Sequence, residues 1–547
     1  MESSRDDRSR VKLSRTAPSV ECPGKQLPCE RVNCGCKIRR WTRQYQPILR
    51  AAVLTLAAAT LYSYHLGYKA LGPSEAYSAL AAAQPTVRAV AHNAMQFDPG
   101  KPVLYHLLLH WFCGWFGTSE TALRAFSLIF GLASVALVFA YCRELFGPQV
   151  AVAAAAMWAF NPLALILARW ARMYSMFVAF SLAHLLAMAK LRHRATITRT
   201  IVAGGLGAAM LYSHLAAVFL IAADLIVVVR EFRCDRRSVS WPAVAIAVFL
   251  FAPFMPAAAA QSRALLFGHW LDWVGVDHSS NATRVLVAGL AAAVLLWLAF
   301  GARHAGEASE TGLRCSLSAV VPLLALAAGS IVIRPMFSIR YAAPSFAVTA
   351  VILAWVLDKR GSRVRNDIAF AITTLLLFLM PLSYAAQNQP WRGIAARVAA
   401  AGNPLEPIFF ETGFFSPERV IDQDENGGFP QGFFLVPFKY YFKQPNPDGA
   451  LPGDDPQLAR QLVESAVRKT GGAWLISGKT RSGAVAELPS GSSFQTDFEQ
   501  DFSRVLLLHV RLVSQSDQRH WVLSHKQALP DPTAFRLNRC NFATARG

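Results

Sequence analysis

Ser74-Glu75-Ala76-Tyr77-Ser78 follows directly after the first long apolar segment of this chain. Further along, the sequence continues Asp98-Pro99-Gly100-Lys101-Pro102-Val103-Leu104-Tyr105-His106-Leu107-Leu108-Leu109. The first stretch places a carboxylate just beyond a membrane helix, and the second has a Lys-Pro that opens an apolar stretch suited to the membrane surface. Together they predict a polar site that faces one aqueous side of a membrane.

The composition supports a membrane protein. Of 547 residues, 54% are hydrophobic, and the mean hydropathy is +0.31. The apolar residues come in blocks of roughly 15 to 20, about the length that a helix needs to cross a bilayer. The formal net charge is +20, but much of it lies in the N-terminal tail and in short loops. This pattern indicates membrane orientation and attraction to anionic lipids, not nucleic acid.

Eleven spans give a consistent topology. With a cytosolic N-terminus, the basic loops 190–194, 230–237 and 359–365 all fall on the cytosolic side, as the positive-inside rule requires. This holds only if residues 102–116 form an interfacial helix that does not cross the membrane. The predicted spans are 48–67, 122–142, 149–167, 173–190, 199–213, 215–230, 241–258, 284–302, 316–334, 341–357 and 367–385.

Three parts follow from this topology. Residues 1–47 are expected to be a basic, disordered cytosolic tail. Its cysteines depart from the paired spacing of zinc sites, which leaves metal binding there as the weaker alternative. Residues 48–385 form an all-α transmembrane domain with a first outer loop at 68–121. Residues 386–547 contain strand-like runs and one helical stretch, which predicts a small extracytoplasmic α/β domain. The cysteines of the N-terminal tail are Cys22, Cys29, Cys34 and Cys36.

Several polar side chains converge on the outer face in this topology. An Arg at membrane depth usually has a partner or faces a water-filled cavity. Several Arg and Lys near a few carboxylates suit a phosphate leaving group beside a general base or a metal. Asp224 lies inside a span and is expected to be paired. The converging residues are Glu75, Asp98, Lys101, Arg124, Arg169, Arg172, Tyr174, His214, His269, Asp272, Asp277, Arg340 and Tyr341.

Each of these residues also has a structural explanation. Glu75 is alternatively a solvated loop acid, and Asp98 a turn residue, because Asp-Pro-Gly is strong turn chemistry. Lys101 is long enough to snorkel to lipid headgroups. Arg172 is alternatively an interfacial anchor. His214 is alternatively a hydrogen-bonded histidine at a helix end.

Six short motifs resemble one family in order and spacing over about residues 50–400. The chain is similar to GT-C glycosyltransferases of the branch that contains the dolichyl-phosphate-mannose protein mannosyltransferases and the lipid A aminoarabinose transferase. One position departs from the family pattern, since Ser74 stands where the family has its first acidic residue. The motifs are Ser74-Glu75-Ala76-Tyr77-Ser78, Lys101 to Leu109, Phe116 to Glu120 with Arg124, Ala171-Arg172-Met173-Tyr174-Ser175, Arg340-Tyr341, and Trp391-Arg392-Gly393-Ile394-Ala395-Ala396.

The resemblance implies an inverting transfer of a sugar from a polyprenyl-phosphate donor. In the family a first-loop carboxylate acts as base on the acceptor hydroxyl, often with a divalent metal nearby, and basic residues hold the lipid phosphate. For this chain it implies Glu75 or Asp98 as the catalytic carboxylate. The donor-binding candidates are Lys101, Arg124, Arg172, Tyr174, Arg340 and Tyr341, and the metal candidates are Glu75, Asp98, His214 and His269.

The leading hypothesis is a glycosyltransferase of a bacterial inner membrane, whose acceptor is a protein, lipid or glycan outside the cytosol. A second hypothesis is a non-catalytic GT-C-like scaffold that binds a lipid-linked glycan, and Ser74 is the residue that favours it. A third, a secondary transporter, predicts inverted repeats that the sequence does not contain.

Overall fold

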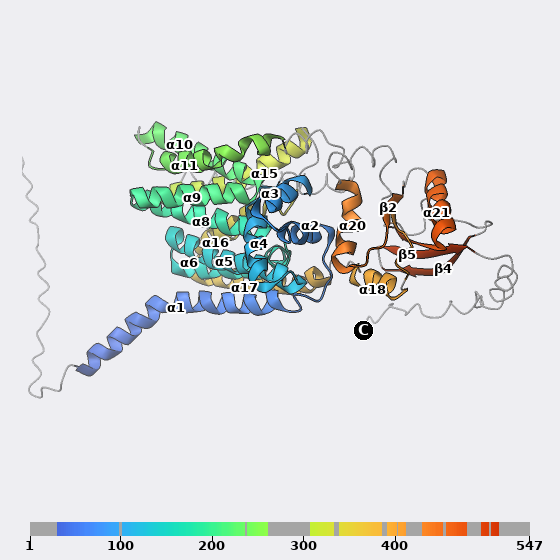
Figure 1. The fold of residues 1–547 in the computed structure, drawn as a ribbon. Helices are drawn as coiled ribbons and strands as arrows, with labels where there is room; N and C mark the ends of the chain where they lie inside the picture. The colour runs from blue at the N-terminus through green and yellow to red at the C-terminus, as the bar shows by residue number, and fades with distance from the viewer. Residues whose placement is uncertain are drawn as a thin grey trace, which may run out of the picture. The chain divides into compact units, whose positions relative to one another are not determined.

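The computed structural model describes residues 30–97, 101–235, 238–260, 307–332, 338–385, 391–401, 403–411, 429–451, 456–477, 494–502 and 505–512 (Figure 1). The chain separates into two compact units, residues 1–49 and residues 50–547. The helical bundle from Arg50 onward, the candidate site and the C-terminal sheet all belong to the second unit.

Long apolar helices form the bundle (Figure 1). Glycine and proline set several of their ends. For example, α5 ends at Gly147, whose φ of +90° is costly for other residues, and Pro148 then opens α6. The bundle helices are α1 (Glu30–Ser63), α5 (Glu120–Phe146), α6 (Pro148–Ala159), α7 (Pro162–Ala168), α8 (Tyr174–His193), α9 (Ile197–Ser213), α10 (Val218–Asp235), α11 (Trp241–Phe251), α15 (Glu307–Val332), α16 (Ala343–Asp358) and α17 (Ser362–Ala385), with short 3-10 turns η1 (Leu215–Ala217) and η2 (Ala252–Phe254).

Five helices of the described residues are long and apolar enough to cross a membrane, and the pair α6–α7 makes a sixth if it is one span. The two helices of this pair are bent by 65°. Pro162 opens α7, and the Asn161 side chain caps it by accepting from the Leu163 amide at 2.9 Å. The predicted span 284–302 lies outside the described residues, so the total of eleven spans stays a prediction.

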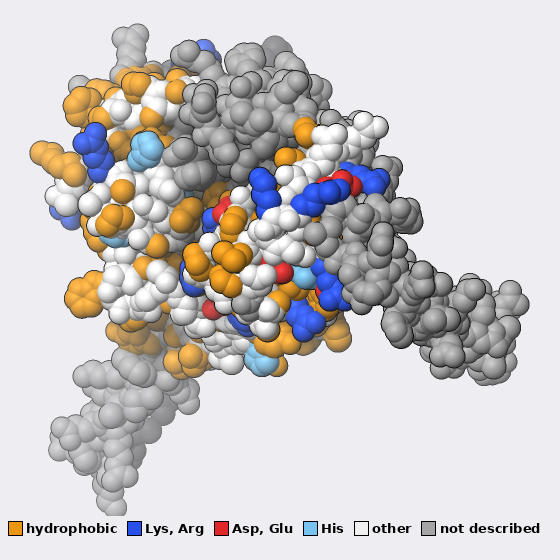
Figure 2. All heavy atoms as spheres, turned by 45° about the vertical axis from the view of Figure 1, so that its right-hand side comes forward, with side chains coloured by type: hydrophobic (Ala, Val, Ile, Leu, Met, Phe, Trp, Pro, Cys, Tyr) orange, Lys and Arg blue, Asp and Glu red, His pale blue; other side chains and the backbone are white. Residues whose placement is uncertain are grey.

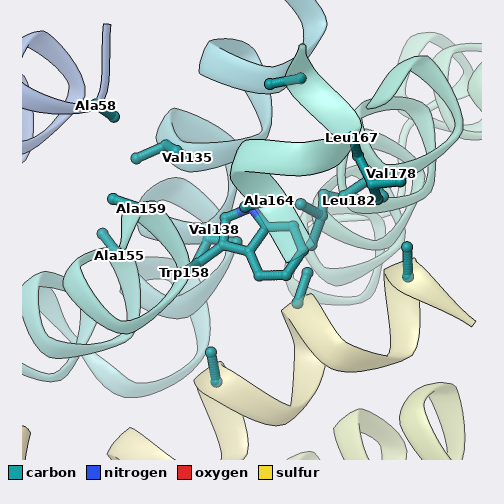
Figure 3. Close-up of a cluster of buried hydrophobic side chains, with 14 of the residues drawn as sticks. Ala58, Val135, Val138, Ala155, Trp158, Ala159, Ala164, Leu167, Val178 and Leu182 are labelled. Carbon is teal, nitrogen blue, oxygen red and sulfur yellow. The ribbon is translucent and has the colours of Figure 1, made fainter. Parts of the chain in front are cut away.

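Small side chains let the helices of the bundle approach closely. The ring of Trp158 is 1% exposed and lies among Val138, Ala164 and Leu182 (Figure 3). Its indole Nε1 donates to Ser134 Oγ at 2.9 Å, so the buried polar atom is satisfied. Ala155, Ala159 and Ala164 lie in the same cluster (Figure 3), and such small residues are typical of helices that associate within a membrane.

One ionisable pair lies inside the bundle. His184 of α8 and Asp224 of α10 are joined by an Nε2–Oδ2 contact of 2.9 Å, and His184 Nδ1 also contacts the Ala203 carbonyl of α9 at 2.9 Å. The prediction that Asp224 is paired is therefore confirmed. Because a lone charge is costly at this depth, the pair connects three helices in a fixed register.

Three short helices connect α1 to α5. They are α2 (Pro73–Ala82), α3 (Val87–Phe97) and α4 (Leu104–Phe116). At 13 residues, α4 is about 20 Å long, well short of the roughly 30 Å of a bilayer core. This length agrees with the interfacial helix predicted at 102–116.

The C-terminal part is an α/β domain, as predicted. Its five-stranded sheet has the order β2-β1-β3-β5-β4, with β1 parallel to β2 and β3, and β5 antiparallel to β3 and β4. Helix α21 (Pro456–Thr470) shares a hydrophobic cluster with β3 and β5. Helices α18 (Trp391–Ala401) and α20 (Phe429–Tyr441) share a second hydrophobic cluster. The strands are β1 (Ile408–Glu411), β2 (Asp448–Leu451), β3 (Gly472–Ser477), β4 (Phe494–Asp501) and β5 (Leu506–Leu512).

The surface differs between the two parts. Figure 2 turns the C-terminal domain toward the viewer, where Lys and Arg side chains lie next to Asp and Glu, whereas hydrophobic side chains cover much of the exposed bundle. Helices α18 and α20 lie between the bundle and the sheet, and α20 packs against α2 (Figure 1). The C-terminal domain therefore contacts the segment that carries Glu75.

Candidate anion-binding site

Glu75 lies in the first turn of α2, and both of its carboxylate oxygens accept hydrogen bonds from other parts of the protein. It is 5% exposed. Its Oε1 accepts from Arg124 Nε at 2.9 Å and from the Ala171 amide at 3.0 Å. Its Oε2 accepts from Arg124 Nη2 at 2.8 Å and from the Gly72 amide at 3.0 Å, which caps the helix. Both oxygens of the predicted base are thus occupied by a bidentate ion pair and two amides.

Arg124, on α5, is equally occupied. Besides its two bonds to Glu75, Nη1 donates to the Leu66 and Lys69 carbonyls at 3.0 and 2.7 Å, and Nη2 donates to the Ala70 carbonyl at 3.1 Å. A guanidinium has five N–H groups, and here each has a protein acceptor. Arg124 was predicted to bind the donor phosphate, but its geometry is that of a residue that fixes the segment before α2.

Arg172 lies in the turn between α7 and α8 and is 3% exposed. Its Nη1 donates to the Ser74 carbonyl at 3.0 Å and to Ser78 Oγ at 3.2 Å. The guanidinium is therefore held against the first two turns of α2. Ser78 was quoted in the sequence motif, but its hydrogen bond to Arg172 was not predicted.

Arg340 lies just before α16, against three aromatic rings. Its Cζ is 5.3 Å from the ring centroid of Trp170, 5.5 Å from that of Tyr174 and 5.4 Å from that of Tyr341. These contacts stabilise the cation through its planar faces. Its Nε is buried and makes no hydrogen bond within the described part of the chain. The Nε–H group of Arg340 is therefore a buried donor that could bind an acceptor of a ligand.

Lys101 approaches the same aromatic group from the residues before α4. Its Nζ lies 3.4 Å from Tyr341 Oη, to which it donates, and 4.9 Å from the centroid of that ring. The side chain is buried, with the residue 7% exposed. Lys101 is thus held inside the protein and does not extend along the surface toward headgroups.

His214 completes the group in the turn between α9 and η1. Its ring lies 4.8 Å from that of Tyr341 and stacks on Phe177 at 5.2 Å. Nδ1 accepts from the Ala216 amide at 3.0 Å, so the neutral ring carries its hydrogen on Nε2. Nε2 is buried and has no hydrogen-bond partner among the described residues.

Electrostatics keep this histidine neutral. Burial lowers the pKa of His214 well below its usual value, and the positive charges of Lys101, Arg340 and Arg172 lower it further. Lys101, Arg340 and His214 all lie against the ring of Tyr341, and Arg172 is two residues before Tyr174, whose ring is next to that of His214. The side chains of the three cations and the Nε2–H group together form a buried, positively charged site suited to an anion.

The structure therefore brings together six of the predicted residues. The grouped residues lie at helix ends on one side of the bundle. Glu75 and Arg124 pair with each other instead. Asp98, His269, Asp272 and Asp277 lie outside the described residues. The grouped residues are Lys101, Arg172, Tyr174, His214, Arg340 and Tyr341.

The described candidates for a divalent metal do not fit one. Each Glu75 oxygen already accepts two hydrogen bonds. The imidazole of His214 lies among cations, which disfavour a second positive charge. Across the described residues, no group of three or more His, Cys, Asp and Glu side chains is placed to hold a metal ion.

The comparisons with known proteins agree with this architecture. Residues 100–256 match the family described as dolichyl-phosphate-mannose-protein mannosyltransferase. The fold matches ArnT from Cupriavidus metallidurans bound to undecaprenyl phosphate, with a TM-score of 0.54 and 13% identity over 84% of this chain and 97% of that chain. The same protein in the apo state gives a TM-score of 0.53, with the same identity and coverage. No curated protein sequence matches the chain.

The chain is thus an integral membrane protein with the fold of the GT-C superfamily of glycosyltransferases. Within that class, residues 100–256, which include helices α4 to α11, match the protein mannosyltransferase family in sequence. The resemblance drawn from the six motifs is confirmed in the fold and in the family match over residues 100–256. The sugar, the acceptor and the roles of individual residues belong to the proposal that follows.

Proposed function

We propose that this protein transfers a sugar from a polyprenyl-phosphate donor to an acceptor outside the cytosol, with inversion at the anomeric carbon. The observation that carries the proposal is the buried cationic site of Lys101, Arg172 and Arg340 beside the Nε2–H of His214. A GT-C relative of the same fold has been solved with undecaprenyl phosphate. A lipid phosphate is an anion, which the charge of this site suits.

The chemistry is one displacement. The acceptor oxygen forms a bond to the anomeric carbon while the bond from that carbon to the phosphate oxygen breaks, and the electron pair leaves with the lipid phosphate. Arg340 and Lys101 would neutralise the charge that grows on this phosphate, and His214 Nε2 would donate a hydrogen bond to it. Donors fixed before the reaction act most strongly in a buried site.

The acceptor proton requires a base, and we propose Asp98 for this role. Glu75, the other sequence candidate, accepts four hydrogen bonds from Arg124 and two amides. Both of its oxygens are therefore occupied, which leaves it poorly placed to take a proton from an acceptor. Asp98 is three residues before Lys101 in the sequence, and Lys101 belongs to the cationic site.

The orientation in the membrane is part of the same proposal. Helix α8 begins at Tyr174, beside the site, and ends with Lys190, Arg192 and His193 in its last turn. Basic residues are favoured on the cytosolic side. The site and the C-terminal domain would then face the extracytoplasmic side of a bacterial inner membrane, with the N-terminus in the cytosol.

One observation favours a second function. Ser74 stands at the family's first acidic position, and the neighbouring Glu75 is engaged in an ion pair. A chain with the cationic site but no competent base would bind a lipid-linked glycan without transferring its sugar. A non-catalytic scaffold is therefore the alternative to the enzyme.

Membranes that contain the wild type, Asp98→Asn or Arg340→Ala separate the two functions. Each is incubated with radiolabelled polyprenyl-phosphate sugars and envelope acceptors, and loss of the donor is followed. We expect Asp98→Asn to lower turnover by about 10²–10⁴-fold, the usual contribution of general base catalysis, while donor binding is retained. Arg363→Ala, an exposed change at the start of α17, is the matched control. Donor binding without turnover in the wild type would identify a scaffold.

A further inference from the structure

Three arginine side chains donate hydrogen bonds to the backbone of the turn between α1 and α2 along its whole length. From Tyr62 to Ala70, eight carbonyl groups accept hydrogen bonds from only three guanidinium groups. Arg169 binds Tyr62, Tyr64 and His65; Arg124 binds Leu66, Lys69 and Ala70; and Arg392 binds Gly67 and Tyr68. This α1–α2 turn (residues 62–71) is therefore held from three directions.

The third arginine comes from the C-terminal domain. Arg392 is the second residue of α18, and it reaches the Gly67 and Tyr68 carbonyls at 3.3 and 3.5 Å. It also forms an ion pair with Glu120 at the start of α5. The C-terminal domain thus contributes to a turn that lies more than three hundred residues earlier in the sequence.

Tyr441, the last residue of α20, adds a second connection. Its Oη accepts from the Leu71 amide at 2.7 Å and donates to Glu120 Oε1 at 3.0 Å. Burial raises the pKa of Tyr441, so its hydroxyl keeps the proton that it donates. Ala70, which precedes Leu71, belongs to the hydrophobic cluster of α18, α20 and β1. The end of the α1–α2 turn is thus part of the C-terminal domain's core.

The turn leads directly into the cationic site. Gly72 is the N-cap of α2, and the carbonyl of Ser74 and the hydroxyl of Ser78 on this helix accept from Arg172. A shift of α2 would therefore displace the acceptors that orient Arg172. The path from Arg392 to Arg172 consists of hydrogen bonds and one short helix.

We propose that Arg392 and Tyr441 are positioning residues, through which the C-terminal domain fixes α2 and so orients Arg172 for the donor phosphate. This inference rests on the proposed function for the identity of the ligand, but not for the mechanical link. Neither residue touches the site itself. Their effect passes through the α1–α2 turn.

Hydrogen exchange of the full-length protein in nanodiscs tests the mechanical link without any ligand. We expect Arg392→Ala and Tyr441→Phe to increase amide exchange in residues 64–80, while exchange in α8, α9 and β3 is unchanged. Arg397→Ala is the matched control, because Arg397 lies on the same helix α18 but stacks on Phe498 within the C-terminal domain. Unchanged exchange in residues 64–80 of both variants would overturn the inference.

Binding of undecaprenyl phosphate tests the consequence for the site. We expect Arg392→Ala to weaken binding about tenfold, the effect of misplacing one charge-assisted hydrogen bond, and Arg397→Ala to change it less than about twofold. If Arg392 acts through Arg172, the double variant Arg392→Ala/Arg172→Ala binds no more weakly than Arg172→Ala alone. Additive losses would contradict the proposed path.

The two arms separate the inference from the proposed function. If Arg172→Ala leaves undecaprenyl phosphate binding unchanged, the donor assignment fails, and the exchange measurement alone then decides whether the C-terminal domain fixes α2. If Arg172→Ala weakens binding but Arg392→Ala does not, the donor site stands and the positioning role is wrong.

Discussion

Arg124 and Arg340 are both arginines at helix ends on the same side of the bundle, and both were predicted to bind the donor phosphate. The structure gives them opposite surroundings. Arg124 donates to a carboxylate and three carbonyls, whereas Arg340 stacks on three aromatic rings. Carbonyl and carboxylate oxygens occupy all five N–H groups of Arg124, whereas the Nε–H of Arg340 has no acceptor among the described residues. The partners of an arginine, and not its position near a site, decide whether it is available to a ligand.

The largest expected effect concerns Arg124 and its ion pair with Glu75. Arg124→Ala leaves the buried Glu75 carboxylate without its ion-pair partner, and we expect a loss of about 3–5 kcal/mol in the free energy of unfolding. Thermal unfolding of the detergent-purified protein measures this change. Arg124→Lys restores the charge but not the fork, so it should be intermediate. If the Arg124→Ala protein were stable and failed only in donor binding, Arg124 would be a phosphate-binding residue after all.

A smaller loss of stability is expected when Glu75, the other partner of that ion pair, is changed. Glu75→Gln removes the charge and turns one acceptor into an NH₂ group that faces donors, so we expect a loss of about 1.5–3 kcal/mol in stability. Turnover per folded molecule should fall much less than in Asp98→Asn. Should Glu75→Gln instead abolish turnover at unchanged stability, Glu75 would be the base and the assignment to Asp98 would be wrong.

For Arg340 we expect the reverse pattern, in which ligand binding is lost and stability changes little. Arg340→Ala removes a cation whose Nε–H has no acceptor among the described residues, so we expect undecaprenyl phosphate binding to weaken about tenfold, or about 1.4 kcal/mol. Its thermal midpoint should change less than that of Arg124→Ala. Equal losses of stability in the two variants would remove the contrast between the two regions.

The smallest effect is a pH dependence at His214. The folded protein holds the pKa of His214 below its unfolded value of about 6.5. The folded state therefore resists a proton that the unfolded state binds, and the resulting stability is present above about pH 6.5 and lost as the pH falls toward the folded pKa. His214→Asn should lose less thermal stability than the wild type between neutral pH and pH 5.5. Identical pH profiles would contradict this assignment.

The fold was largely predictable from the sequence because its signals are local. Apolar blocks marked the helices α5, α8 and α15, and the alternation of turn and apolar residues marked β1 and β3. The motifs at Lys101, Arg172 and Arg340 also pointed to residues that converge in space. Local composition and motif order were sufficient for these features.

The partners of the individual residues were not predictable. Nothing in the sequence around Arg124 distinguishes it from Arg340, because the distinction depends on which groups the fold brings to each guanidinium. The same holds for Arg392, which the motif analysis quoted without a role. Its contacts with Gly67 and Tyr68 span more than three hundred residues of sequence. Contacts of such separation leave no local periodicity or spacing to detect.

The distance in sequence between Arg392 and the α1–α2 turn also sets an order of assembly. A chain is synthesised from its N-terminus, so the turn leaves the ribosome long before α18 and α20 exist. Arg169 and Arg124 become available while the bundle is inserted, but the Gly67 and Tyr68 carbonyls and the Leu71 amide have to wait for the last third of the chain. The entrance to α2 is therefore completed only when the C-terminal domain folds, which couples maturation of the site to completion of the whole polypeptide.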